Sequence, residues 1–306
     1  MKHERVVSDK FDAIKFRAFV DEFKGKYKFP ASEGHLCDLA STFKSGNEEY
    51  IKEDLDFLGD ISNGIMLGIQ DADEKLILIK GDIKEQFKEV ALDNDPEPVF
   101  SVTGESHEVN MQALPSGSLL RPLLEKNSGI IDSKLMEDFL GSIWENIDNP
   151  EFYKKFRVEI ANLSDTFSKT DTILSQESSY FKRIEAFMKI GEISDLNILA
   201  DKFCDIFVSF LAIDDKKLEN LKLGEKIQSA YAILDFSPLF RDKINKKNKP
   251  SNMYRDIKNL IFASGAKYYV TEDDATYKKS KFILKALNVK TRVVKMDELR
   301  FALMAL

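Results

Sequence analysis

The hydrophobic pattern at the two ends of the chain constrains the fold more than any other feature. Strand-like apolar runs alternate there with helical stripes, whereas residues 119–241 have a helical period almost throughout. Alternating strands and helices are typical of a parallel sheet covered by helices. We therefore predict one α/β core that is built from both chain ends and interrupted by a helical insertion.

The predicted architecture is helix-rich, with three layers around a central parallel sheet and a large all-helical insertion. Its parts are an N-terminal part of the core at 1–118, the insertion at 119–249 and a C-terminal part of the core at 250–306. The predicted strands cover residues 4–8, 26–29, 65–70, 75–80, 267–270 and 290–295. The predicted helices of the two ends cover 11–23, 33–43, 48–62, 254–264 and 275–287, with a last helix from Asp297.

The composition is that of an ordinary globular chain of 306 residues, with 43% apolar residues and a net charge of −7. This charge disfavours a protein that coats nucleic acid, but a nuclease needs basic residues only along one cleft. The longest apolar run, 207–213, is too short to cross a membrane. The first residues contain no apolar signal segment, so we expect a cytoplasmic protein without a membrane partner. Cys37 and Cys204 lie in apolar helical patterns, which predicts buried free thiols.

An acidic cluster, residues 272–274, directly follows the predicted strand at 267–270. A helix from Asp256 followed by a returning strand brings Asp256 and Asp273 to the same edge of the sheet. Asp9 would end the first strand at that edge. Ser32 would begin the next helix there, with Glu33 and Asp38 in its first two turns. Ligands bind at this edge in open α/β sheets.

Several carboxylates at one edge repel each other unless a cation neutralises them, and Mg²⁺ or Mn²⁺ suits oxygen ligands. The predicted metal ligands are Asp9, Glu33, Asp38, Asp256, Asp273 and Asp274. Solvated or helix-capping roles are the alternative for each of these acids. Lysines follow the cluster, and we predict that Lys278, Lys279 and Lys281 form a basic rim that contacts nucleic-acid phosphates. A solvated helix face is the alternative for these lysines.

The segment 255–299 resembles the C-terminal part of PIN-domain ribonucleases, the superfamily of the bacterial VapC-type toxins. In that family an Asp opens a helix, an Ala-rich turn follows, and a strand ends in Thr-x-Asp. The matching residues here are Asp256, Ala263, Thr271 and Asp273. RVVSD resembles the first PIN strand, which ends in a metal-binding Asp, and FPASEGHLCDL resembles the second strand with its acidic residue, here Asp38. The resemblance covers about 110 residues at the two chain ends.

The resemblance implies a PIN-like fold and a metal-dependent ribonuclease, with Asp9, Asp38, Asp256 and Asp273 as catalytic metal ligands and Thr271 orienting the site. A water activated by Mg²⁺ or Mn²⁺ would attack an RNA phosphodiester, and single-stranded DNA is a second possible substrate.

One departure favours another function. The family usually continues its first strand as Asp-(Thr/Gln)-Asn, whereas this chain reads Asp9-Lys10-Phe11. The alternative is a catalytically inactive PIN-like scaffold whose helical insertion binds a protein partner. A receiver-like phosphoacceptor domain also clusters aspartates at strand ends, but it lacks a middle block of this length.

Overall fold

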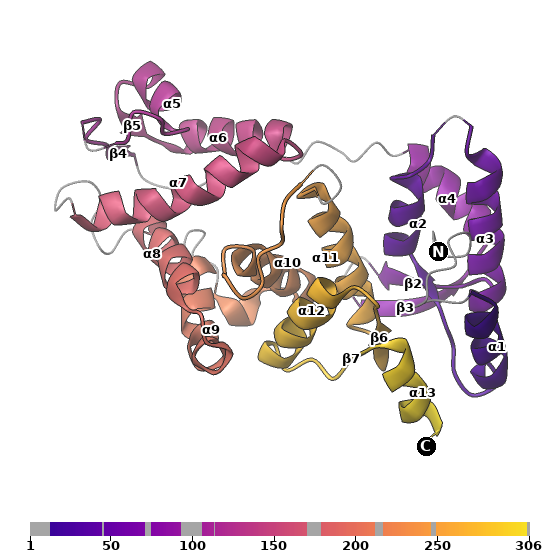
Figure 1. The fold of residues 1–306 in the computed structure, drawn as a ribbon. Helices are drawn as coiled ribbons and strands as arrows, with labels where there is room; N and C mark the ends of the chain where they lie inside the picture. The colour runs from indigo at the N-terminus through magenta and orange to yellow at the C-terminus, as the bar shows by residue number, and fades with distance from the viewer. Residues whose placement is uncertain are drawn as a thin grey trace. The chain divides into compact units, whose positions relative to one another are not determined.

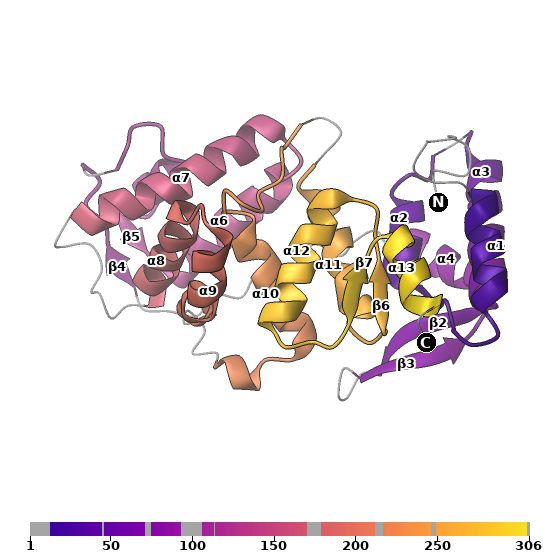
Figure 2. The ribbon, with the colours of Figure 1, turned by 60° about the horizontal axis from the view of Figure 1, so that its bottom comes forward.

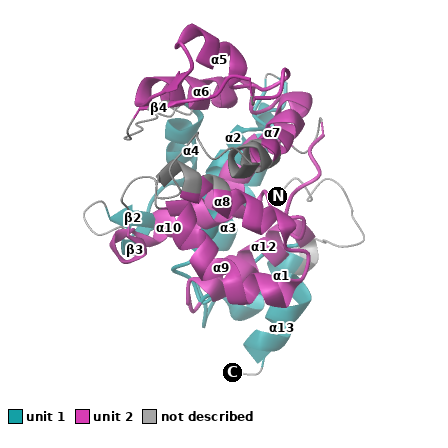
Figure 3. Cartoon of the chain, turned by 90° about the vertical axis from the view of Figure 1, so that its left-hand side faces the viewer, with its two compact units in different colours: residues 1–97, 258–272, 291–306 teal, residues 98–257, 273–290 magenta. Residues whose placement is uncertain are grey.

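A computed structural model describes residues 13–44, 46–70, 75–92, 106–112, 114–169, 179–211, 217–245 and 249–304. The chain divides into two compact units (Figure 3). The first unit comprises residues 1–97, 258–272 and 291–306, and the second comprises 98–257 and 273–290. The division falls inside one helix, between Ile257 and Lys258. The domain boundaries predicted from the sequence stay predictions, because compactness alone does not identify an insertion.

The first unit contains most of the strands (Figure 1). Its elements are α1 (Ala13–Phe23), β1 (Ala31–Ser32), α2 (Glu33–Ala40), α3 (Glu48–Ser62), β2 (Ile65–Gln70), β3 (Lys75–Lys80), α4 (Ile83–Leu92), β6 (Tyr268–Val270), β7 (Arg292–Val294) and α13 (Met296–Met304). The C-terminal part of α11 (Ser251–Ala263) belongs to it as well. The helices α3, α4 and α13 begin with acidic residues in their first turns, which favours a helix N-terminus electrostatically.

The prediction of one central parallel sheet is wrong for the described residues, whose strands form separate small sheets. β1 pairs with β2 in parallel. β2 pairs with β3 in an antiparallel hairpin, and β6 pairs with β7 in parallel (Figure 2). Only four residues join β2 to β3, and a parallel crossover needs a dozen or more. The coarser prediction of a helix-rich α/β chain is confirmed.

The strand predicted at 26–29 does not form. Tyr27 and Phe29 pack instead against an aromatic core around Phe19 and Phe23. Pro30 has no N–H to donate to a ladder, so pairing starts only at Ala31. The strand predicted at 4–8 lies outside the described residues.

Both chain ends contribute to one core in the first unit. Phe19 and Phe23 of α1 share a buried cluster with Val294 of β7 and with Leu299 and Leu303 of α13. A second cluster joins α2, α3, β2 and α4. The sequence therefore predicts correctly that segments from the two ends of the chain pack together.

The second unit is mainly helical. It contains β4 (His107–Glu108), α5 (Arg121–Lys126), β5 (Ile130–Ile131), α6 (Ser133–Asn146), α7 (Pro150–Lys169), α8 (Ser179–Glu192), α9 (Leu196–Leu211), a 3₁₀ turn (Leu218–Asn220), α10 (Leu223–Leu234) and α12 (Asp274–Ala286). Phe203 of α9 meets Phe282 of α12 edge to face, with ring centroids 5.1 Å apart. Such aromatic contacts join α12 to the helices around it.

None of the described helices has the length and apolar character that a membrane span requires. The prediction of two buried thiols is wrong, because Cys204 is exposed and Cys37 is half-buried.

Candidate functional site

The helix α2 starts directly at the end of β1, and its first turn is fixed by a capping contact. The backbone N–H of Ser32 donates to Nδ1 of His35 at 3.1 Å, and the Ser32 hydroxyl lies 2.7 Å from the same nitrogen. A side chain three residues into a helix that bonds back to the N-cap is the geometry of a capping box. His35 therefore has a structural role at the helix start.

Two predicted ligands on α2 contact the C-terminal part of α11 within the first unit. Lys258 Nζ lies 3.0 Å from Glu33 Oε1, and Asn259 Nδ2 donates to Asp38 Oδ2 at 3.1 Å. The approach is close because Gly34 has no side chain, and a Cβ there would lie 2.2 Å from Asn259 Oδ1. Glu33 thus has an ammonium group beside it, which would compete with a metal ion.

The end of β6 is held by the elements that follow it in the first unit. Thr271 N donates to Val294 O at 3.2 Å, which extends the pairing of β6 with β7 by one residue. Glu272 Oε1 accepts from Met296 N at 2.8 Å and so caps the start of α13. Glu272 therefore has a structural role, one of the alternatives open for this acidic cluster.

Asp273 is the N-cap of α12 in the second unit. Its Oδ1 accepts from Thr276 N at 2.7 Å, and Asp274 lies in the first turn. Carboxylates at a helix N-terminus are stabilised by its unpaired N–H groups and its dipole. Both side chains are exposed. The helix-capping alternative is thus realised for Asp273, and its carboxylate also faces solvent.

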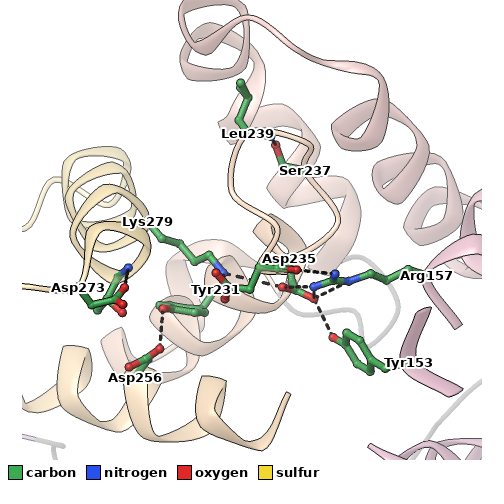
Figure 4. A network of polar contacts seen from close by, with 11 residues as sticks. Tyr153, Arg157, Tyr231, Asp235, Ser237, Leu239, Asp256, Asp273 and Lys279 are labelled. Atoms are coloured by element: carbon green, nitrogen blue, oxygen red, sulfur yellow. Dashed lines mark hydrogen bonds and ion pairs between the residues drawn. The ribbon is translucent and has the colours of Figure 1, made fainter. Parts of the chain in front are cut away.

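Asp256 belongs to a polar network that joins α11, α10 and α12 in the second unit (Figure 4). Tyr231 OH donates to Asp256 Oδ2 at 3.5 Å, a long contact. Lys279 Nζ lies 4.6 Å from the centre of the Tyr231 ring, a cation–π arrangement. Asp256 and Asp273 are drawn at the end of this network that is opposite Arg157 (Figure 4).

Lys279 is not a member of an exposed basic rim, and that prediction is corrected. Only 1% of its side chain is exposed. Its Nζ lies 3.3 Å from Asp242 Oδ2 and 3.9 Å from Asp235 Oδ1. A buried ammonium needs such partners because it loses its hydration. Lys279 therefore neutralises the buried Asp235 and the half-buried Asp242, and its ammonium is not available to a phosphate.

Asp235 is the centre of the network. Two nitrogens of the Arg157 guanidinium, Nε and Nη2, donate to the Asp235 carboxylate. Nη2 lies 2.7 Å from both Oδ1 and Oδ2. Tyr153 OH donates to Oδ2 at 2.8 Å. Burial, and next the negative charge of Asp235, raise the pKa of Tyr153 far above its usual range, so the phenol stays protonated.

The remaining lysines of the predicted rim are exposed on α12. Lys281 Nζ lies 3.0 Å from Tyr277 OH, and its ammonium is 5.0 Å from the centre of that ring. Lys278, Lys281 and Lys285 are spaced by three and four residues, which places them on one helix face. A phosphate-binding role for Lys278 and Lys281 stays a prediction.

The network around Asp235 was not predicted from the sequence. Arg157 and Asp235 are 78 residues apart, and no local pattern joins them. One signal was present, because Asp235 is the only charged residue between Lys226 and Arg241. A single acid within an apolar helical stretch predicts a buried carboxylate with a cationic partner.

The predicted metal ligands are divided between the two units. Glu33 and Asp38 belong to the first unit, and Asp256, Asp273 and Asp274 belong to the second. Asp9 lies outside the described residues. Within the described part of the chain, no three acidic, histidine or cysteine side chains converge into a metal-binding group. The oxygen donors of these acids fit Mg²⁺ or Mn²⁺ in their chemistry.

Comparison of the chain with protein-family models, with curated proteins and with solved structures gives no match.

Proposed function

We propose that this chain is a PIN-like, metal-dependent ribonuclease. The observation that carries the proposal is the parallel pairing of β6 with β7, which α12 connects in sequence. Thr271 and Asp273 follow β6 directly, at the carboxyl end where parallel α/β units bind ligands. The same residues form the Thr-x-Asp pattern of the family resemblance.

A second observation supports the proposal. Asp38, a candidate ligand, lies on α2, and α2 contacts the C-terminal part of α11 within the first unit. Asp38 of α2 is bonded to Asn259 of α11, and Gly34 lets the two helices approach. The sequence alone gives no reason for a glycine at that position, and the contact supplies one.

The proposed metal ligands of the second unit are Asp256 and Asp273, whereas Asp9 and Asp38 are separate candidate ligands of the first unit. Glu33 fits less well, because Lys258 already neutralises it. When bound, Mg²⁺ or Mn²⁺ would activate a water and stabilise negative charge on the phosphodiester. The protein would hold the carboxylates in place through the N-cap contact of Asp273 and the amide of Asn259.

The substrate would bind through exposed cations of α12. Lys278 and Lys281 are proposed to contact phosphates of RNA, or of single-stranded DNA as the second substrate. Lys279 is not proposed to bind a phosphate, because its buried ammonium pairs with Asp242 inside the second unit.

A cleavage assay tests the proposal. Wild type is expected to cleave single-stranded RNA with Mn²⁺ or Mg²⁺, and Asp256→Asn and Asp273→Asn are expected to reduce cleavage to background. Asparagine is an equally good N-cap, so Asp273→Asn removes charge without unfolding α12. Asp201→Asn, on the exposed side of α9, is the matched control and should cleave like wild type. Equal cleavage by all variants would point to a contaminating nuclease and contradict the proposal.

The second candidate is an inactive scaffold. The ammonium of Lys258 beside Glu33 favours it, as does the Phe11 departure in the sequence. The helical second unit exposes Val158 at 57% and Leu196 at 51%, which could contact a protein partner. No cleavage of RNA or single-stranded DNA by the wild type, together with no effect of Mn²⁺ on stability, would favour the scaffold.

A further inference from the structure

The sulfur of Cys37 lies next to an amine in the first unit. Lys258 Nζ, on α11, is 3.7 Å from Cys37 Sγ on α2 and 3.0 Å from Glu33 Oε1. Cys37 is half-buried, and 39% of the Lys258 side chain is exposed. Cys37 is therefore not fully enclosed by the core, and the flexible lysine stem can bring its nitrogen closer to the sulfur.

We propose that Cys37 and Lys258 form a sulfur–nitrogen crosslink when hydrogen peroxide or an organic hydroperoxide oxidises Cys37. The proposal does not rest on the ribonuclease function. It assigns a modification site that joins α2 to α11, two helices more than two hundred residues apart in sequence.

The first step is the oxidation of the sulfur. The thiolate is the form of cysteine that reacts with peroxides. The thiolate attacks one peroxide oxygen, the O–O bond breaks and hydroxide leaves. The product is a sulfenic acid, in which sulfur has lost two electrons and the peroxide has gained them.

The second step is the condensation. Nitrogen nucleophiles condense with sulfenic acids. The Lys258 side chain reacts as the neutral amine, after its ammonium has lost a proton to solvent, and its nitrogen attacks the sulfur. The S–N bond forms, the S–O bond breaks, and the hydroxyl leaves as water after taking up a proton. In total, the thiol, the amine and one peroxide give the crosslink and two waters.

Two further side chains bear on this order of events. Glu33 Oε1 lies 3.0 Å from the lysine nitrogen. The exposed Cys204 of the second unit provides an internal comparison, because its sulfur has no lysine contact among the described hydrogen bonds. We therefore expect Cys204 to take up oxygen only.

Intact-protein and peptide mass spectrometry test the proposal. The Cys204→Ser variant has one cysteine, so no disulfide can form within its chain. It is treated with a small excess of hydrogen peroxide at low protein concentration, which disfavours disulfides between chains. We expect a product that is lighter than the reduced chain by two hydrogen atoms, with the peptides containing Cys37 and Lys258 joined. A thiol reductant should separate them.

The matched control is Lys258→Arg in the same background. It keeps the positive charge beside the sulfur but removes the amine, so Cys37 should gain oxygen and no crosslink should form. Cys37→Ser should show neither change. Two results would overturn the proposal. One is oxygen gain at Cys37 without joined peptides in the Cys204→Ser protein that keeps Lys258, and the other is joined peptides in the Lys258→Arg variant.

Discussion

Two adjacent lysines of α12 differ completely in environment. Lys278 is exposed, whereas Lys279 is buried against Asp235, Asp242 and Tyr231. Neighbouring residues of a helix point in directions about 100° apart, so a run of identical residues cannot form one surface. A cluster of lysines in the sequence therefore does not by itself predict a basic patch.

We expect Lys279→Ala to destabilise the second unit by about 1–3 kcal/mol, because Asp242 loses its ammonium partner and a buried side chain is removed, while Arg157 still pairs with Asp235. Lys278→Ala is the matched control and should leave the free energy of unfolding almost unchanged. Urea unfolding followed by circular dichroism measures both. Equal stability of the two variants would show that Lys279 is not buried as described.

At the scale of elements, the sequence predicts more than at the scale of residues. The helix predicted at 48–62 has the bounds of α3, and the strands predicted at 65–70 and 75–80 have those of β2 and β3. Periodicity is a local signal, so it finds such elements. It does not find which strands pair, because pairing depends on turn lengths and on distant contacts.

The contact of α2 with α11 depends on Gly34. We expect Gly34→Ala to lower stability by about 1–3 kcal/mol, because the new Cβ would overlap the Asn259 side chain. Gly59→Ala, in α3, is the matched control. A Cβ at Gly59 meets nothing within 4 Å, so alanine should stabilise that helix by up to about 1 kcal/mol.

Thermal and urea unfolding of the two glycine variants check this prediction. The double variant Gly34→Ala with Asn259→Ala should regain part of the stability lost by Gly34→Ala alone, since it removes the overlapping atoms. Independent, additive effects of the two substitutions would contradict the described contact.

At the scale of the whole molecule, segments from both chain ends share the core of the first unit. The alternation of strands and helices at the two ends predicts this, because each end alone has too few strands for a core. The candidate site was predicted less completely. Asp256 and Asp273 are predicted from the sequence as metal ligands and stay predictions, whereas the roles of Lys279 and Asp235 depend on contacts between helices far apart in the chain.

The most direct test of the account is the effect of Mn²⁺ on thermal unfolding. An ion that binds only the folded chain stabilises it by about 2.7 kcal/mol at a hundredfold excess over its dissociation constant. We predict that millimolar Mn²⁺ raises the unfolding temperature of wild type and of Asp201→Asn, and has little effect on Asp256→Asn and Asp273→Asn. If Mn²⁺ leaves the unfolding temperatures of all four proteins unchanged, the result contradicts a metal site at these carboxylates.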